Sequence, residues 1–221
     1  MAKNKDCRLR GAIFFAFTLL FTISAANAQE IPRWNFNVGG GVGFPLNSTA
    51  DFANNGANFV VGGGPNLNHL LGLSAEFMWD DLPVKKSVVQ QLQVPDASTR
   101  QYAVTLNAIF RVPTRGRLGF YAIGGGGWYH RSGELTAPTL VPGTVCPAFW
   151  VWWGSCVSGL FPANAVLASS SSDAFGGNIG GGVTLKIGEG NLKFYSEVRY
   201  HHAAHDHIDT DVLPLTFGLR W

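Results

Sequence analysis

QYAVTLNAIFRV, residues 101–112, is the stretch that decides the fold, because large apolar and polar side chains alternate along it with a period of two. One face carries Tyr102, Val104, Leu106, Ala108, Phe110 and Val112, and the other carries Thr105, Asn107 and Arg111. Alternation of this kind is typical of a β-strand with one apolar face. The stretch is therefore predicted to be a strand at the boundary between an apolar and a polar environment.

The same alternation recurs through the rest of the chain, whereas helical spacing is hard to find. Strands are expected at residues 34–44, 57–66, 71–79, 102–112, 118–130, 174–187, 192–200 and 213–221. Glycine runs within several of these ranges do not match nucleotide-binding loops, and they suit the inner wall of a curved sheet. The sequence therefore predicts an all-β protein with eight antiparallel strands and no cofactor.

The connections between the expected strands alternate between short and long. Tight turns are expected at 65–70, 113–117 and 188–191, and long connections at 45–56, 80–99, 131–173 and 203–212. Short turns on one rim, long loops on the other and an even strand number are typical of up-and-down transmembrane β-barrels of outer membranes. This pattern predicts periplasmic short turns and termini, with long loops, above all 131–173, on the extracellular side.

The N-terminal residues have the composition of a signal peptide. Basic residues precede an apolar segment at 11–25, and Ala26-Asn27-Ala28 forms a small-residue cleavage site. Cleavage after Ala28 would leave 29–221 as the barrel domain. The first 28 residues contain four of the 16 basic and one of the 14 acidic side chains, so the mature net charge is −1. That charge gives no support for nucleic-acid binding.

The polar faces of the strands indicate which side faces lipid. They hold mainly Gly, Asn, Ser and Thr with isolated charges, and charged residues are only 14% of the chain. A soluble barrel needs a charged outer surface, so this set is better suited to a narrow lumen. The alternative is a periplasmic lipocalin-like binder, in which the apolar faces would point inward.

The isolated charges of the polar faces predict ionic pairs inside the lumen. These residues are Glu76, Arg111, Lys186, Glu197, Arg199 and Arg220. An eight-stranded barrel is only wide enough for side chains, so a general porin is disfavoured and a narrow channel is the alternative.

The C-terminal sequence LPLTFGLRW (213–221), together with the signal peptide and the eight strands, resembles the OmpA/OmpX-like family of small outer-membrane β-barrels. In that family, a last strand with alternating apolar residues and a final aromatic residue is the signal for the barrel-assembly machinery. The resemblance implies that Phe217, Leu219 and Trp221 form this signal, with Trp in place of the usual Phe.

A group of histidines lies near the fourth long connection: His201, His202, His205 and His207, with aspartates beside them. Imidazole and carboxylate groups can bind zinc or copper, although a solvated polar loop explains the same residues. We expect no metal, and these four are the only candidate ligands.

His130, Ser132 and Glu134 at the end of the fifth expected strand form an H-x-S pair with an acid nearby, which resembles the outer-membrane lipid A deacylases. A base beside a hydroxyl is the chemical requirement for a nucleophile. Residues two apart on a strand are separated by about 6.6 Å, however, so an ordinary strand would keep the pair apart.

The third long connection, 131–173, contains two cysteines and an aromatic cluster. Cys146 and Cys156 are an even pair in an exported protein, which predicts a disulfide. Trp150, Val151, Trp152 and Trp153 lie between them and are expected to contact lipid or a partner.

These observations predict a monomeric outer-membrane barrel with a structural or surface-interaction role and no enzymatic activity. Its expected partners are outer-membrane lipid and lipopolysaccharide, which its loops would contact, and the barrel-assembly machinery. The alternatives are a lipid-A-modifying enzyme, a narrow channel and the periplasmic lipocalin-like binder.

We expect the mature protein to fractionate with the outer membrane and to change its SDS-gel mobility on boiling, because a closed strand ring resists unfolding in detergent. Electrophoresis of boiled and unboiled samples measures this. A soluble periplasmic protein with one mobility would instead support the lipocalin-like alternative.

Overall fold

A computed structural model describes residues 32–91, 93, 95–114, 116–146 and 154–221. Their strands are β1 (Trp34–Pro45), β2 (Gly56–Pro65), β3 (Leu71–Pro83), β4 (Asp96–Val112), β5 (Leu118–Val145), β6 (Val157–Lys186), β7 (Lys193–Ala203) and β8 (Thr210–Arg220). The eight-stranded all-β prediction is confirmed. The predicted signal peptide and Trp150 to Trp153 lie outside the described residues.

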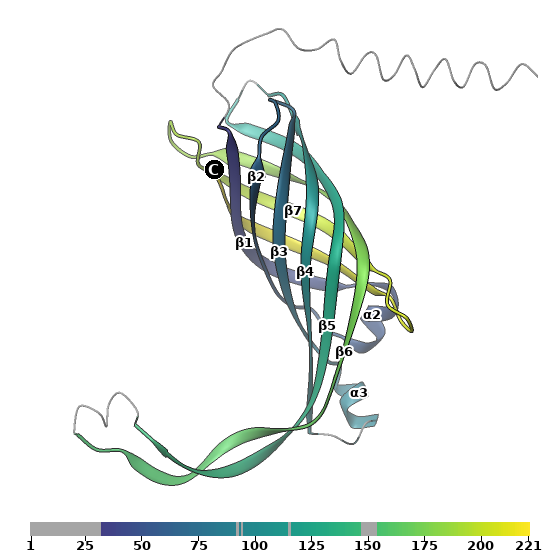
Figure 1. The fold of residues 1–221 in the computed structure, drawn as a ribbon, viewed down its shortest axis with the longest axis vertical. Coiled ribbons are helices and arrows are strands. Elements are labelled where there is room, and N and C mark those ends of the chain that lie inside the picture. Colours follow the sequence, from purple (N-terminus) through teal and green to yellow (C-terminus); the bar gives the residue numbers. More distant parts are fainter. Residues whose placement is uncertain (1–31, 92, 94, 115, 147–153) are drawn as a thin grey trace, which may run out of the picture. The chain divides into compact units, whose positions relative to one another are not determined.

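The strands form a closed barrel in which each strand pairs antiparallel with its neighbours in the sequence (Figure 1). The seam is the pairing of β1 with β8, which places Gly39 opposite Gly218 and Val42 opposite Leu215. Two backbone hydrogen bonds between Phe36 and Trp221, of 2.9 and 3.0 Å, extend the seam to the last residue. The ring therefore has no open edge along the barrel.

The two faces of the strands are separated as the alternation predicted. Along β3, Ser74, Glu76 and Asp80 are buried inside the barrel, while Leu73 and Phe77 are exposed on its outer surface. Much of the buried set is polar, and many exposed side chains are large and apolar. This arrangement is the opposite of a lipocalin-like barrel, so that alternative is wrong.

Close packing across the lumen explains one of the glycines. The side chain of Tyr195 lies over Gly39 of β1, where a Cβ atom would come within 2.3 Å of the tyrosine hydroxyl oxygen and 2.9 Å of the Phe217 carbonyl oxygen. A larger residue at this position would displace Tyr195 or the β1–β8 seam.

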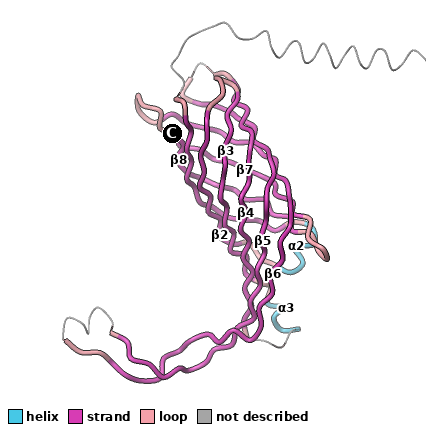
Figure 2. Tube along the Cα trace, viewed as in Figure 1, coloured by secondary structure: helices cyan, strands magenta, loops and turns pink. Residues whose placement is uncertain are grey.

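The connections differ in length between the two rims of the barrel. Short turns join β2 to β3, β4 to β5 and β6 to β7, on the rim that also carries residues 34 and 221. On the other rim, the β1–β2 connection contains helix α2 (Asn47–Phe52) and the β3–β4 connection contains α3 (Lys86–Gln91) (Figure 2). Among the described residues, no helix is long and apolar enough to cross a membrane.

The third long connection is not the loop that was expected at 131–173. β5 pairs with β4 only as far as Thr136, yet it continues to Val145 while pairing with β6. Residues 137–145 and 157–165 therefore form a two-stranded ribbon beyond the barrel, which turns away from the barrel strands (Figures 1 and 2). Apolar and small residues with high β-propensity, Val, Thr, Leu and Phe, occupy much of it and explain why it pairs.

Candidate functional site

The centre of the lumen is an ionic network around Arg199 of β7. Its guanidinium contacts Glu76 of β3 at 2.5 Å (Nη1 to Oε2) and Glu197 of β7 at 2.8 Å (Nε to Oε1), with a second contact to Glu197 through Nη2. All three side chains are at most 5% exposed. Because charges buried without partners are costly, the lumen requires these pairs.

Polar neighbours complete the hydrogen bonding of both carboxylates. The hydroxyl of Tyr121 donates to Glu197 at 2.7 Å, and the amide of Asn107 donates to Glu76 at 2.9 Å. Arg220 lies 3.6 Å from Glu197 and also packs over the Tyr121 ring, 4.4 Å from its centre. Six residues from β3, β4, β5, β7 and β8 thus hold one another across the barrel.

The network leaves little open space in the lumen. The cavity lined by Asn58, Met78, Glu197, Arg199 and His201 has a volume of about 10 Å³. That is room for about one water molecule.

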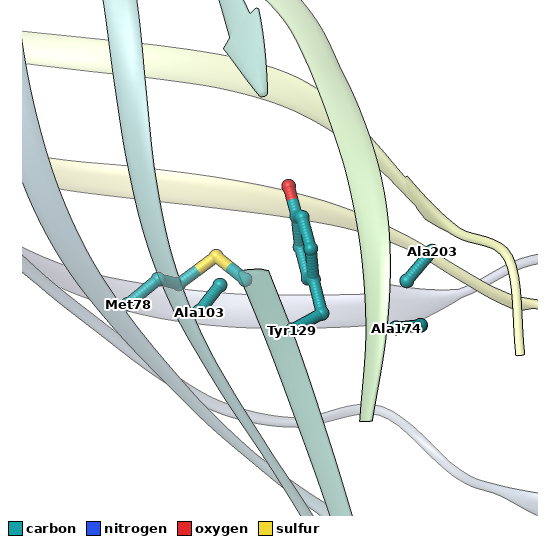
Figure 3. Packing of buried hydrophobic residues seen from close by; sticks show 5 residues of the cluster. All are labelled: Met78, Ala103, Tyr129, Ala174 and Ala203. Atoms are coloured by element: carbon teal, nitrogen blue, oxygen red, sulfur yellow. The ribbon is translucent and has the colours of Figure 1, made fainter. Parts of the chain in front are cut away.

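Next to this network, on the side of the rim that carries the ribbon, a small layer of apolar side chains lines the lumen. It consists of Met78, Ala103, Tyr129, Ala174 and Ala203, of which only Met78 and Tyr129 are large (Figure 3). The hydroxyl of Tyr129 lies 2.9 Å from Nδ1 of His201. Met78 and Ala203 of this layer lie nearer to the rim that carries the ribbon than Glu76 and Arg199 of the network do.

Between this layer and that rim, Asp80 and Gln101 are neighbours across β3 and β4. Both are almost completely buried, and Asn58 donates a 2.8 Å hydrogen bond to Asp80. The second carboxylate oxygen of Asp80 and both amide atoms of Gln101 have no partner within the described residues. Sequence reasoning missed these two residues, because a single polar residue on a lumen face gives no distinctive signal.

The predicted ionic bridges in the lumen are confirmed for Glu76, Glu197, Arg199 and Arg220. Arg111 instead donates a 2.6 Å hydrogen bond to Asn66 near the short-turn rim. Lys186 is exposed and has no ion pair with any described residue.

The histidine group is divided among different partners. His201 faces the lumen, whereas its neighbour His202 faces outward and its Nδ1 lies 2.8 Å from Asp211. The remaining two lie in the β7–β8 connection, where His205 is buried with its Nδ1 3.0 Å from Ser172 and His207 is exposed. Burial and the nearby charge of Arg131 lower the pKa of His205.

These four histidines therefore do not form one site. Strand alternation in β7 sends His201 and His202 to opposite faces. Within the described residues, no group of three or more His, Cys, Asp or Glu side chains could hold a metal ion.

Asp211 is the most connected residue at this rim, and sequence reasoning did not single it out among the aspartates. It accepts hydrogen bonds from Tyr200 at 2.6 Å and from Asn47 of α2 at 2.9 Å, in addition to its contact with His202. Its backbone N–H donates to the hydroxyl of Thr49 at 2.9 Å. These bonds attach α2 to the end of the barrel.

The three residues proposed as weak catalytic candidates lie on β5 near the same rim. His130 faces outward, and its Nδ1 lies 2.8 Å from the carboxylate of Asp173 on β6. Ser132 is opposite Arg100 and Ser171, and Glu134 is opposite Ser98 and Ser169. No described hydrogen bond joins His130 to Ser132 or Glu134, so the acid partner of the histidine is Asp173.

Aromatic side chains on the outer surface gather near both rims. Near the short turns, Phe36 packs against Trp34 and Trp221, with ring centres 6.4 and 6.0 Å apart. Near the other rim, His130 packs between Tyr102 and Trp128 at 6.2 and 5.6 Å. Two aromatic bands around an apolar belt are typical of outer-membrane barrels.

The structure forms the predicted disulfide between Cys146 and Cys156 at the end of the ribbon. Most large apolar side chains of the ribbon are exposed, among them Leu140, Val141, Val157 and Leu160. The ribbon therefore presents an apolar surface beyond the barrel.

Comparison with known proteins agrees with this architecture. The family described as outer membrane protein beta-barrel domain matches residues 13–220. No curated protein sequence matches the chain.

Two solved structures illustrate the similarity. Neisserial surface protein A (NspA) has 13% sequence identity and a TM-score of 0.56, covering 86% of this chain and 96% of its own. Ail, the attachment invasion locus protein of Yersinia pestis, has 14% identity and a TM-score of 0.49, covering 86% of this chain and 100% of its own. At 13% identity, the similarity to NspA concerns the fold alone.

Replacing Arg199 with Met should destabilise the barrel by about 3–5 kcal/mol, because Glu76 and Glu197 would keep buried charges without their partner. Thermal unfolding in detergent, followed by the heat-dependent gel shift, measures the loss. The triple variant that adds Glu76→Gln and Glu197→Gln should recover most of it. Equal stability of the single variant and the parent would show that the ionic network does not stabilise the barrel.

Proposed function

Because the chain belongs to the outer membrane protein beta-barrel domain family, we propose that it is a structural or surface-interaction barrel whose long connections contact the cell's surroundings. The observation that carries this proposal is the combination of a closed lumen and an exposed ribbon. The Arg199 network crosses the lumen beside a cavity of about 10 Å³, which favours a structural role over solute passage. The rim with the long connections carries α2, α3, the histidines with Asp211 and the ribbon. These are the groups that another molecule can contact.

The proposed orientation places the short turns and both barrel ends in the periplasm. The rim with α2, α3 and the ribbon then faces the exterior. Family members of this architecture have short periplasmic turns and longer extracellular loops, which supports the assignment. In this orientation, the ribbon and the Asp211 cluster meet lipopolysaccharide, matrix or other cells.

The last strand supports a proposed interaction with the barrel-assembly machinery. Phe217, Leu219 and Trp221 all point outward from β8 and are at least 38% exposed. They form a row of apolar side chains that ends on the aromatic residue, at the rim assigned to the periplasm. A transient partner can therefore contact this row from outside the barrel, and lipid takes the place of the partner after insertion.

A second candidate function, a lipid-A-modifying enzyme, is favoured by one observation, the hydrogen bond between His130 and Asp173 on the outer surface. A carboxylate that orients an imidazole is one part of a hydrolase site. The other part is a hydroxyl within reach, and Ser132 is about 6.6 Å further along the strand. The pair is explained equally well as a cross-strand polar contact above the aromatic band.

Expression of the protein should leave the mass spectrum of lipid A unchanged, because no described hydroxyl is bonded to His130. Lipid A extracted from expressing and non-expressing cells provides the measurement. Loss of an acyl chain in cells with the parent protein, but not with His130→Ala, would establish the enzyme.

The surface-interaction role is tested by removing the ribbon. Replacement of residues 137–165 with Asn-Gly joins Thr136 to Val166, which are already opposite each other, through a two-residue hairpin. The barrel should keep its heat-dependent gel shift, since 137–145 pairs only with β6. Binding of lipopolysaccharide to the detergent-solubilised protein should fall to the background level measured without protein.

The matched control is Glu189→Gln, in a short turn at the other rim, which should leave lipopolysaccharide binding unchanged. Equal lipopolysaccharide binding by the parent and the ribbon deletion would contradict a surface role for the ribbon. Loss of the gel shift in the deletion would instead show that the ribbon is needed for folding.

A further inference from the structure

The ribbon is uncharged along its entire length. No Asp, Glu, Lys, Arg or His occurs between Glu134 and Asp173, although charged residues make up 14% of the whole chain. Leu140 and Leu160, on one face of the ribbon, are 61% and 64% exposed. An exposed surface with large apolar groups and no charge is unusual for a segment surrounded by water, and it points to an apolar contact.

The free edges of the ribbon are unsuited to pairing with another strand. Pro138 and Pro142 on β5 and Pro162 on β6 have no backbone N–H, so each must face its nitrogen away from the partner strand. Both outer edges therefore lack donors where an added strand would need them. Prolines at exposed edges disfavour strand addition by a second copy or by an extended peptide.

The outer face of the ribbon continues the lipid-facing surface of the barrel. β5 has no inserted residue in this region, so Pro138, Leu140 and Pro142 fall on the same face as Trp128 and His130. The extra residue is on β6, where Leu167 separates the partners of Leu135 and Thr136. Such a bulge increases the local twist, and it lies where the pairing of β5 with β4 ends. Beyond this point the ribbon turns away from the barrel strands (Figure 1).

A polar band separates the two apolar regions. It contains the pairs His130 with Asp173, Ser132 with Ser171 and Glu134 with Ser169, and the neighbouring pair Arg100 with Asp81. The outer surface thus passes from apolar side chains to an aromatic band, then to polar groups and finally to the uncharged ribbon. The apolar side chains, the aromatic band and the polar groups correspond to the hydrocarbon, the interface and the headgroup region of a bilayer. The ribbon follows the polar groups and can fold back onto the bilayer surface.

We propose that the ribbon lies on the outer surface of the membrane that holds the barrel, with the Leu140 and Leu160 face in the boundary between headgroups and acyl chains. The contact uses side chains, because an open two-stranded ribbon cannot bring its unpaired backbone groups into hydrocarbon. The barrel keeps the ribbon next to this bilayer at a high effective concentration, which no second membrane shares. The inference rests on the proposed function and names membrane lipid as the partner of the exposed apolar face of the ribbon.

The test is photochemical labelling of the full mature protein in liposomes that contain a phospholipid with a diazirine on its acyl chain. After illumination and digestion, mass spectrometry locates the lipid adducts. Adducts are expected at 137–145 and 157–165, and also at Ile179 and Val183 on the exposed face of the barrel, which serve as an internal standard. Adducts at the barrel positions without any on the ribbon would overturn the inference alone, whereas absence at both would also overturn the membrane barrel.

Charge variants show whether the apolar face makes the contact. Leu140→Glu with Leu160→Glu should reduce ribbon adducts by about tenfold relative to the barrel standard, since charged groups are expelled from hydrocarbon. Ser169→Glu with Ser171→Glu places the same two charges in the polar band and should leave the ribbon adducts unchanged. Equal labelling of the Leu variant and the parent would contradict the proposal.

Two further experiments test whether the ribbon contacts a second membrane or a second copy of the chain. Proteoliposomes without the probe, mixed with protein-free vesicles that carry it, should give no ribbon adducts, and labelling there would show a second membrane as the partner. Protein-to-protein adducts through the ribbon, in place of lipid adducts, would show a second copy of the chain. Either result would overturn the assignment to the membrane that holds the barrel.

Discussion

The structure depends on one constraint: within a bilayer, every backbone N–H and C=O must find a partner inside the protein. Seven hairpin pairings satisfy most of these groups, and the β1–β8 seam satisfies the remainder. The seam also requires small residues, because Gly39 and Gly218 face each other beneath the side chain of Tyr195. The end of the chain is part of this closure, since Phe36 and Trp221 exchange two backbone hydrogen bonds.

Closure with eight strands leaves a lumen that side chains fill, and the polar faces of the strands must neutralise one another there. Arg199 lies between two carboxylates, and Arg220 packs on tyrosine rings beside one of them. These ion pairs link β3, β7 and β8 across the lumen.

The ribbon is the part of the sheet to which closure does not apply. Beyond Thr136, β5 has lost β4 as a neighbour, so both edges of the ribbon are open. A two-stranded hairpin is marginally stable alone, and here the disulfide between Cys146 and Cys156 closes its end. Prolines at its edges disfavour the addition of another strand, and its uncharged side chains favour an apolar contact. Both properties agree with the proposed contact between the ribbon and lipid.

The sequence by itself determined the eight strands, their order, the direction of their apolar faces and the cysteine pair, because a period of two and turn residues are local properties. It also indicated Glu76, Glu197, Arg199 and Arg220 as lumen charges, since one strand suffices to place a residue on a face. Only the tertiary structure decided which charges meet, that Asp173 is the partner of His130, and that the four histidines separate. Each of these depends on register between strands, as does the replacement of the expected 131–173 loop by a ribbon. A run such as Leu140 to Val145 carries no clear alternation, so its pairing with β6 becomes visible only when the two strands lie opposite each other.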